Sequence, residues 1–235
     1  MFEAHVDQAG GLHELDLELV TRVIPVLATD DSVLSFDWLY QLHNGLQSLG
    51  HDVVVIDHLN GLMVEDANLG HQRVLQRWLQ GVEPGSVVLL HAPLEAMAVL
   101  LNHSQARPLV ALEPDQRSAV WAYNAVKVLQ QVGELRPLVL TRGNTPAHRA
   151  AAQVLQQSCE KHLQLSPPVW WLEYHDHQSR WPDAAQEAFF LKVLDSALMT
   201  DIHRDRCHDD PSFERRTPYT GSIVGVPDVH RQRHA

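Results

Sequence analysis

Short apolar runs alternate with longer segments of helical period between about residue 20 and about residue 200. The runs are rich in β-branched residues and continuously apolar, which is typical of strands that helices cover on both faces. They predict strands at 22–28, 52–57, 86–91, 108–112, 137–141 and 169–172. The periodic segments predict helices at about 34–49, 69–80, 94–103, 116–132, 146–163 and 183–200, the first followed by a helix-ending Gly50. Repeated strand, helix, strand units favour right-handed crossovers, so the predicted class is α/β: a mostly parallel sheet with helices on both faces.

Both ends of the chain lie outside this pattern. Residues 1–20 contain a short helical stretch, whereas residues 201–235 hold three prolines, two glycines, and six arginines against six acidic residues. We therefore expect three parts: an N-terminal partner-binding helix at 1–20, an α/β domain at 21–200 and a flexible tail at 201–235.

Composition excludes several classes of protein. With 18 Lys+Arg against 29 Asp+Glu the formal charge is −11, which argues against a protein whose main task is binding nucleic acid. Cys159 and Cys207 are too few for a disulfide framework or a four-thiolate zinc site. No apolar run approaches the roughly 20 residues that span a bilayer, and the first residues do not resemble a signal peptide. We expect a cytoplasmic protein without direct membrane binding.

The loop after the first predicted strand, residues 29–36, is where an open α/β sheet binds a phosphate. Such a loop needs glycines for close backbone approach, a lysine for the phosphates and Ser or Thr for magnesium. This loop has no glycine and no lysine, and the carboxylates of Asp30 and Asp31 would repel a triphosphate. The sequence therefore predicts that ATP and magnesium are not bound.

The order and spacing of residues 22–175 resemble MinD/ParA-type ATPases. In that family the loop is a deviant Walker A motif, KGGxGKT in one-letter form. Placed on it, the signature lysine is replaced by Asp30, two glycines by Asp31 and Ser32, and a third glycine by Leu34. Ser35 stands at the phosphate-binding lysine and Phe36 at the magnesium-binding threonine.

Two strand ends extend this resemblance. Asp57 matches the acidic residue that the family has at the end of its second strand, whereas His91 stands where the metal-associated aspartate would be. The resemblance implies a MinD-like fold and a pseudo-ATPase with no catalytic residues. Its vestigial nucleotide pocket would comprise Asp30, Asp31, Ser32, Ser35, Phe36, Asp57 and His91.

Simpler interpretations of these two side chains stay open. An aspartate at a strand end often bonds the following turn, and a histidine at a buried strand end is often a hydrogen-bonded core residue. A further alternative is a residual enzyme that uses His91 or Asp57 on a small ligand.

A short motif precedes the first strand. Asp7, Gln8, Ala9 and Leu12 match the DQAxxLR helix of FlhG (also called FleN), the MinD-like regulators of flagellar number and placement, while His13 replaces the arginine. In that family the helix docks on the flagellar GTPase FlhF and stimulates GTP hydrolysis. A glutamine can orient an attacking water, whereas His13 lacks the permanent charge and bidentate donors of arginine. The simpler interpretation is a leader that packs over the sheet.

The resemblance implies a non-hydrolysing, FlhG-like regulator of flagellar biosynthesis. It would bind FlhF and be recruited to the flagellated pole through its partners. Any dimer would form without ATP. Further partners would be rotor or transcription-regulator proteins. The alternative is a MinD-like scaffold in another envelope system, such as cellulose secretion or cell division. Histidine clusters at 175–177 and 203–208 contain zinc-ligand types, but their place in loop and tail sequence predicts adventitious binding rather than a metal site.

Overall fold

The computed structural model describes residues 20–28, 32–57, 71–172 and 183–200, except for the side chains of 32–35. These residues form one sheet with the strands β1 (Thr21–Leu27), β2 (Val53–Asp57), β3 (Val87–His91), β4 (Leu109–Leu112), β5 (Leu138–Arg142), β6 (Val169–Leu172) and β7 (Leu198–Thr200). The helices between them are α1 (Ser32–Ser48), α3 (His71–Trp78), α4 (Leu94–Leu100), α5 (Gln116–Gln131), α6 (Pro146–Leu163) and α7 (Ala184–Asp195). The α/β class with a mostly parallel sheet is confirmed.

The strand order is β2-β3-β1-β4-β5-β6, with all neighbours on this path parallel. From β1 the chain crosses past the position of β3 to β2, then returns through β3 and continues on the opposite side of β1 through β4, β5 and β6. Connections therefore leave β1 and β4 in opposite directions. A crevice at the carboxyl ends of two such strands is the usual ligand position in open α/β sheets.

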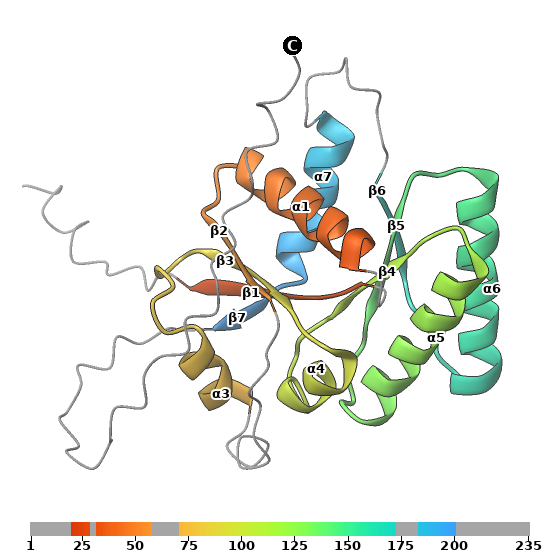
Figure 1. Ribbon diagram of the computed structural model, residues 1–235, viewed down its shortest axis with the longest axis horizontal. Helices are drawn as coiled ribbons and strands as arrows, with labels where there is room; N and C mark the ends of the chain where they lie inside the picture. Colours follow the sequence, from red (N-terminus) through yellow and green to blue (C-terminus); the bar gives the residue numbers. More distant parts are fainter. Residues whose placement is uncertain (1–19, 29–31, 58–70, 173–182, 201–235) are drawn as a thin grey trace, which may run out of the picture.

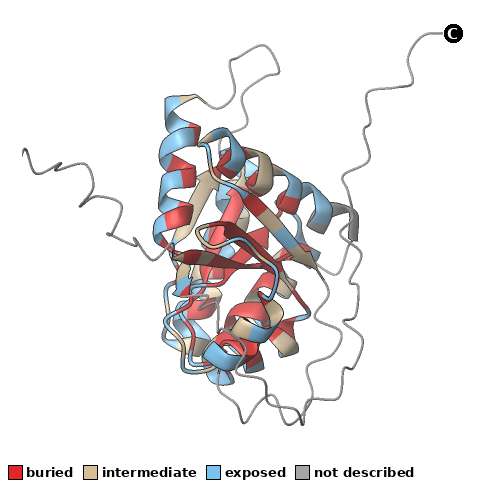
Figure 2. Ribbon diagram, turned by 90° about the vertical axis from the view of Figure 1, so that its left-hand side faces the viewer, coloured by how far each residue is buried: buried red, intermediate tan, exposed pale blue. Residues whose placement is uncertain are grey.

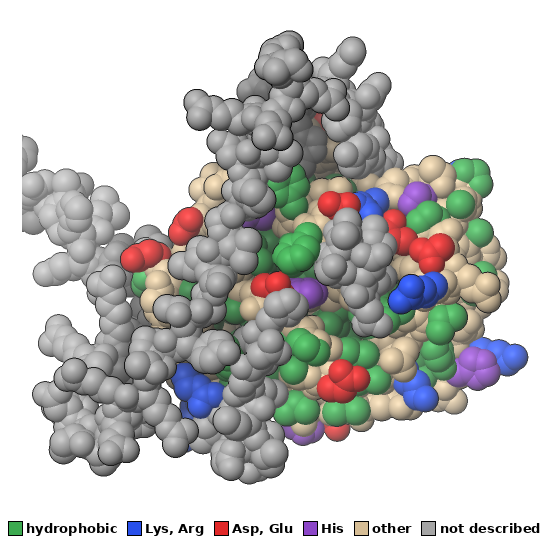
Figure 3. Space-filling view, viewed as in Figure 1, with side chains coloured by type: hydrophobic (Ala, Val, Ile, Leu, Met, Phe, Trp, Pro, Cys, Tyr) green, Lys and Arg blue, Asp and Glu red, His purple; other side chains and the backbone are tan. Residues whose placement is uncertain are grey.

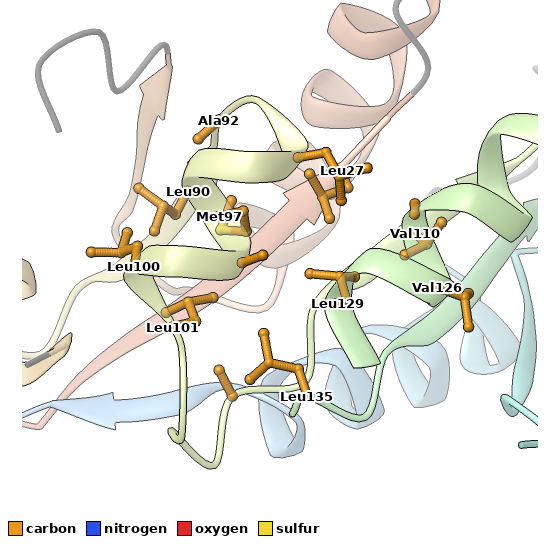
Figure 4. Close-up of a cluster of buried hydrophobic side chains, with 14 of the residues drawn as sticks. Leu27, Leu90, Ala92, Met97, Leu100, Leu101, Val110, Val126, Leu129 and Leu135 are labelled. Carbon is orange, nitrogen blue, oxygen red and sulfur yellow. The ribbon is translucent and has the colours of Figure 1, made fainter. Parts of the chain in front are cut away.

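Helices cover both faces of the sheet. Helices α1 and α7 lie on one face, and α3, α4, α5 and α6 lie on the other (Figure 1). Burial divides accordingly into two clusters, with Trp38, Leu42 and Phe190 on the α1 side, and Met97 and Leu129 among those on the other. The buried strands form the central layer between exposed helix surfaces (Figure 2). Side chains of α4 and α5 belong to the same buried cluster as side chains of β1, β3 and β4 (Figure 4).

Local sequence explains several helix ends. Asp115 caps α5 by accepting from the backbone N–H of Ser118 at 2.8 Å. Asp183 and Gln186 form a capping box at the start of α7. Gly50 has φ +86° just after α1, which confirms the predicted glycine stop.

Two expectations about element bounds are wrong. The predicted helix 183–200 ends at Asp195, and residues 198–200 form β7, which pairs antiparallel with β1 (Thr21 with Thr200). The predicted loop 29–36 is shorter than expected, because α1 begins at Ser32 and includes Ser35 and Phe36. No glycine or proline occurs between 32 and 44, so nothing there opposes an earlier helix start.

Every helix in the described ranges is too short or too polar to cross a lipid bilayer.

Candidate functional site

A cavity of about 870 Å³ lies at the carboxyl ends of β4 and β5, beside the first half of α1. Strand β4 is also a neighbour of β1 in the sheet, and connections leave these two strands in opposite directions. Its lining residues are Asp37, Tyr40, Gln41, Glu113, Pro114, Arg142, Gly143, Asn144, Thr145 and His148. Figure 3 shows acidic and basic side chains close together on the side of the molecule where α5 and α6 begin. The volume falls in the range of pockets that hold small organic molecules or several side chains.

Glu113 organises the wall of this cavity. Its Oε1 accepts from the indole Nε1 of Trp38 at 2.9 Å, from Nε of Arg142 at 2.9 Å and from Nη2 of Arg142 at 2.6 Å. The side chain of Glu113 is 11% exposed and that of Arg142 is 17% exposed. Charge-assisted hydrogen bonds of this length, shielded from water, are among the stronger polar contacts in proteins. The cluster therefore holds the ends of β4 and β5 against α1.

The backbone places Glu113 firmly. Its N–H donates to the hydroxyl of Ser118 at 2.8 Å, and Ser118 in turn lies in the first turn of α5, which Asp115 caps. The guanidinium of Arg142 also lies over the ring of Trp38, 5.3 Å from its centroid, a cation–π distance. The carboxylate and the guanidinium are thus fixed from two sides before any ligand arrives.

The electrostatics of the cavity do not suit a phosphate. The lining has two carboxylates, Asp37 and Glu113, and one guanidinium, that of Arg142. Nε and Nη2 of this guanidinium already donate to Glu113, and its Nη1 lies 3.7 Å from Asp37. The start of α6 offers little more, because Pro146 has no N–H and Thr145 caps the N–H of His148. An anion would find few available donors here.

A second polar pair lies across β1 from this cavity. Asp57 and His91 end the adjacent strands β2 and β3, are register partners, and are joined between Oδ1 and Nδ1 at 2.6 Å. Their side chains are 23% and 15% exposed. The structure thus brings these two predicted residues together, in agreement with the interpretation of His91 as a hydrogen-bonded histidine.

Of the other predicted residues, only Phe36 has a described side chain. Phe36 lies in the first turns of α1 with 52% of its surface exposed. Ser32 and Ser35 are in the backbone of α1, and their side chains are outside the description. The remaining predictions, Asp7, Gln8, Ala9, Leu12, His13, Asp30 and Asp31, lie outside the described residues, as do the histidine clusters at 175–177 and 203–208.

A magnesium ion does not fit the described side chains of the predicted pocket, which are those of Phe36, Asp57 and His91. A magnesium ion bound to a nucleotide needs carboxylate or hydroxyl oxygens with room for water. Here the carboxylate of Asp57 is engaged by an imidazole, and Phe36 brings an exposed ring where the resemblance puts a magnesium-binding hydroxyl.

The sequence alone did not indicate the cavity. Glu113 and Arg142 are separated by 29 positions, and Trp38 and Glu113 by 75, so only the strand order makes them neighbours. The available signal was positional: Glu113 and Arg142 each stand at the carboxyl end of an apolar run, where ligand-binding residues of α/β sheets collect.

Comparisons with known proteins give little guidance. No protein-family model matches the chain, and no curated protein matches it. A solved structure titled "Structure of MT0777" aligns with 74% of this chain and 95% of its own, at 14% identity and a TM-score of 0.30. Nothing about the activity of this chain follows from a similarity of that size.

Proposed function

We propose that this chain is a non-hydrolysing, FlhG-like regulator that acts by binding proteins and presents residues 1–20 to the flagellar GTPase FlhF. The observation that carries the proposal is the bond between Asp57 and His91. At the strand ends where the resembled ATPases need a metal-associated carboxylate, Oδ1 of Asp57 is bound to Nδ1 of His91 at 2.6 Å. A fold of nucleotide-binding type whose site has lost its metal chemistry is suited to serve as a platform for partners.

The exposed surface of α1 supports the same conclusion. Phe36 and Tyr40 are four residues apart and are 52% and 53% exposed. Side chains at this spacing lie on one helix face, and aromatic residues are enriched at protein interfaces. The proposal places the regulator at the flagellated pole through its partners rather than through a membrane anchor of its own.

The first test concerns nucleotide. Calorimetry of the intact protein with ATP and magnesium should give no binding heat, because residues 29–36 contain neither a glycine nor a lysine. Micromolar affinity with turnover would contradict the pseudo-ATPase assignment. A His91→Asp variant is the control: it removes the imidazole but restores neither glycines nor lysine to the loop, so it should also fail to bind ATP.

The second test concerns the GTPase. Intact protein should accelerate GTP hydrolysis by FlhF, and Gln8→Ala should abolish the gain while leaving the thermal unfolding of the α/β body unchanged. His13→Arg should increase the stimulation, because arginine adds a permanent charge and bidentate donors. If intact protein leaves the FlhF rate unchanged, the proposed partner is wrong.

A further inference from the structure

The wall of the cavity that α1 provides is rich in hydrogen-bond acceptors. Asp37 and Gln41 are one helical turn apart and both line the cavity. The side chain of Asp37 is 56% exposed, and its Oδ2 lies 3.7 Å from Nη1 of Arg142, a long separation for an ion pair. The Oε1 atom of Gln41 is buried and has no hydrogen-bond partner among the described residues. Because this oxygen is covered by protein, the exposed carboxylate of Asp37 is the acceptor that a ligand with N–H groups can reach.

An aromatic face adjoins these acceptors. Tyr40 also lines the cavity and is 53% exposed, so its ring is accessible. A cation held over such a ring is attracted to its negative face. The lining holds two carboxylates, Asp37 and Glu113, against the one guanidinium of Arg142, so carboxylates outnumber guanidinium groups there.

We infer that this cavity receives an arginine side chain from a basic segment of a partner protein. A guanidinium carries five N–H donors in a plane, so it can donate to both oxygens of the Asp37 carboxylate and also stack on an aromatic ring. A lysine ammonium lacks this planar geometry. The inference does not depend on residues 1–20 and so goes beyond the proposed docking on FlhF.

The surroundings favour a protein segment over a free small cation. The cavity, at about 870 Å³, is larger than one guanidinium needs. Phe36 extends the exposed apolar surface from Tyr40 along α1. Arginine and tyrosine are the residues most often found at the energetic centres of interfaces, where apolar neighbours exclude water. The charge of −11 over the whole chain would attract a basic segment.

The test uses the intact protein and two capped pentapeptides, Gly-Leu-Arg-Leu-Gly and the same peptide with citrulline for arginine. Citrulline keeps the shape but is neutral. Titration followed by amide NMR should shift the signals of Tyr40, Gln41 and Asn144, together with the indole N–H of Trp38. The arginine peptide should bind at least about tenfold more tightly than the citrulline peptide, because a charge-assisted bond is lost.

Two variants and one control locate the site. Asp37→Asn should weaken the arginine peptide about tenfold, and Tyr40→Ala should weaken it about threefold or more. Glu160→Gln is the control: Glu160 is exposed near the end of α6, about 18 Å along the helix from His148. The affinity of the Glu160→Gln variant for the arginine peptide should equal that of the unmodified protein.

Three results would overturn the inference: equal affinity for both peptides, an unchanged affinity of Asp37→Asn, or binding of methylguanidinium as tight as that of the arginine peptide. The last would assign the cavity to a small cation. Because none of these measurements involves FlhF or residues 1–20, failure here leaves the proposed function standing, and the converse also holds.

Discussion

A single oxygen atom determines how the candidate site is built. The Oε1 of Glu113 accepts from Trp38 and twice from Arg142, so three donors depend on one acceptor. A carboxylate taken largely out of water is stable only when it is satisfied in this way. Removing it would leave a guanidinium and an indole N–H without their partner in a place that water reaches poorly.

Glu113→Gln should therefore lower the free energy of unfolding by about 2 to 3 kcal/mol, because the neutral amide no longer balances Arg142. Urea denaturation followed by circular dichroism measures this change. Arg142→Met in the Glu113→Gln background should recover part of the loss, since the unpaired charge is gone. Additive losses in the double variant would contradict the ion pair as the cause.

Cys159 offers a different test at the scale of one residue. Burial raises the pKa of the Cys159 thiol to about 11, and the negative charge of Glu160 adds to the rise. The unfolded chain releases this proton nearer the ordinary value of 9.0. Stability from the buried neutral thiol is therefore fully present below pH of about 9 and is lost as the pH rises toward about 11.

We expect the stability of the unmodified protein to fall more steeply across that window than the stability of Cys159→Ala. Chemical denaturation at half-unit steps of pH measures the two slopes. The comparison cancels contributions from tyrosines, lysines and Cys207, which both proteins share. Parallel slopes would mean that the thiol is accessible to water in the folded protein.

At the scale of elements, α1 packs very closely against α7 at Gly45. Gly45 faces the ring of Phe190 on α7, and a Cβ added at Gly45 would overlap the Cζ and Cε atoms of that ring. Phe190 is fully buried, so it cannot turn outward without opening the layer above the sheet. The close approach of α1 and α7 thus requires a residue without a side chain at position 45.

Gly45→Ala should destabilise the protein by about 1 to 3 kcal/mol through overpacking, although alanine favours helix by about 1 kcal/mol over glycine. Thermal unfolding provides the measurement. The matched control is Gln47→Ala, an exposed position of the same helix, which should be neutral or slightly stabilising. Gly45→Ala combined with Phe190→Leu should regain stability relative to Gly45→Ala alone.

Hydrophobic patterns in the sequence predict the presence of helices and strands better than they predict where a helix ends and a strand begins. The six parallel strands lie within one residue of the ranges that their apolar runs predict, because buried parallel strands are short and continuously apolar. The failure is local: Leu198 and Met199 continue the apolar character of α7, and three residues are too few for a strand period to differ from a helical one. Pairing with β1, a tertiary contact, decides the outcome.

The candidate site was less accessible to prediction than the fold. Asp57 and His91 could be paired because both end apolar runs that the resemblance makes neighbours. The cluster of Trp38, Glu113 and Arg142 depends on β4 lying beside β1, on the far side from β2. That strand order depends on the crossovers of the whole sheet, so the local sequence around these three residues does not reveal it.

For the whole molecule, the strand order determines how strongly the backbone amides of each strand are protected from hydrogen exchange. β1 has β3 along one side and both β4 and β7 along the other, whereas β2 and β6 end the described path of strands. Val55 in β2 is 39% exposed, while Val23 and Ile24 in β1 are completely buried. Buried, doubly paired strands open only with the larger cooperative unit.

Hydrogen exchange measured by mass spectrometry should therefore show peptides over 21–27 to be protected longest, and peptides over 53–57 and 169–172 to exchange sooner. The ranking should persist under mild denaturant, as it follows from position in the sheet. Faster exchange in β1 than in β2 would contradict the strand order.

The antiparallel pairing of β7 with β1 also fixes how the folded body would respond to a pulling force. Thr21, where the sheet begins, is the register partner of Thr200, and Arg22 and Val23 face Met199 and Leu198. Tension applied at residues 21 and 200 therefore loads this ladder from one end, and its hydrogen bonds break one after another rather than all at once. The body should yield by unzipping at low force, with β7 as the first element to detach.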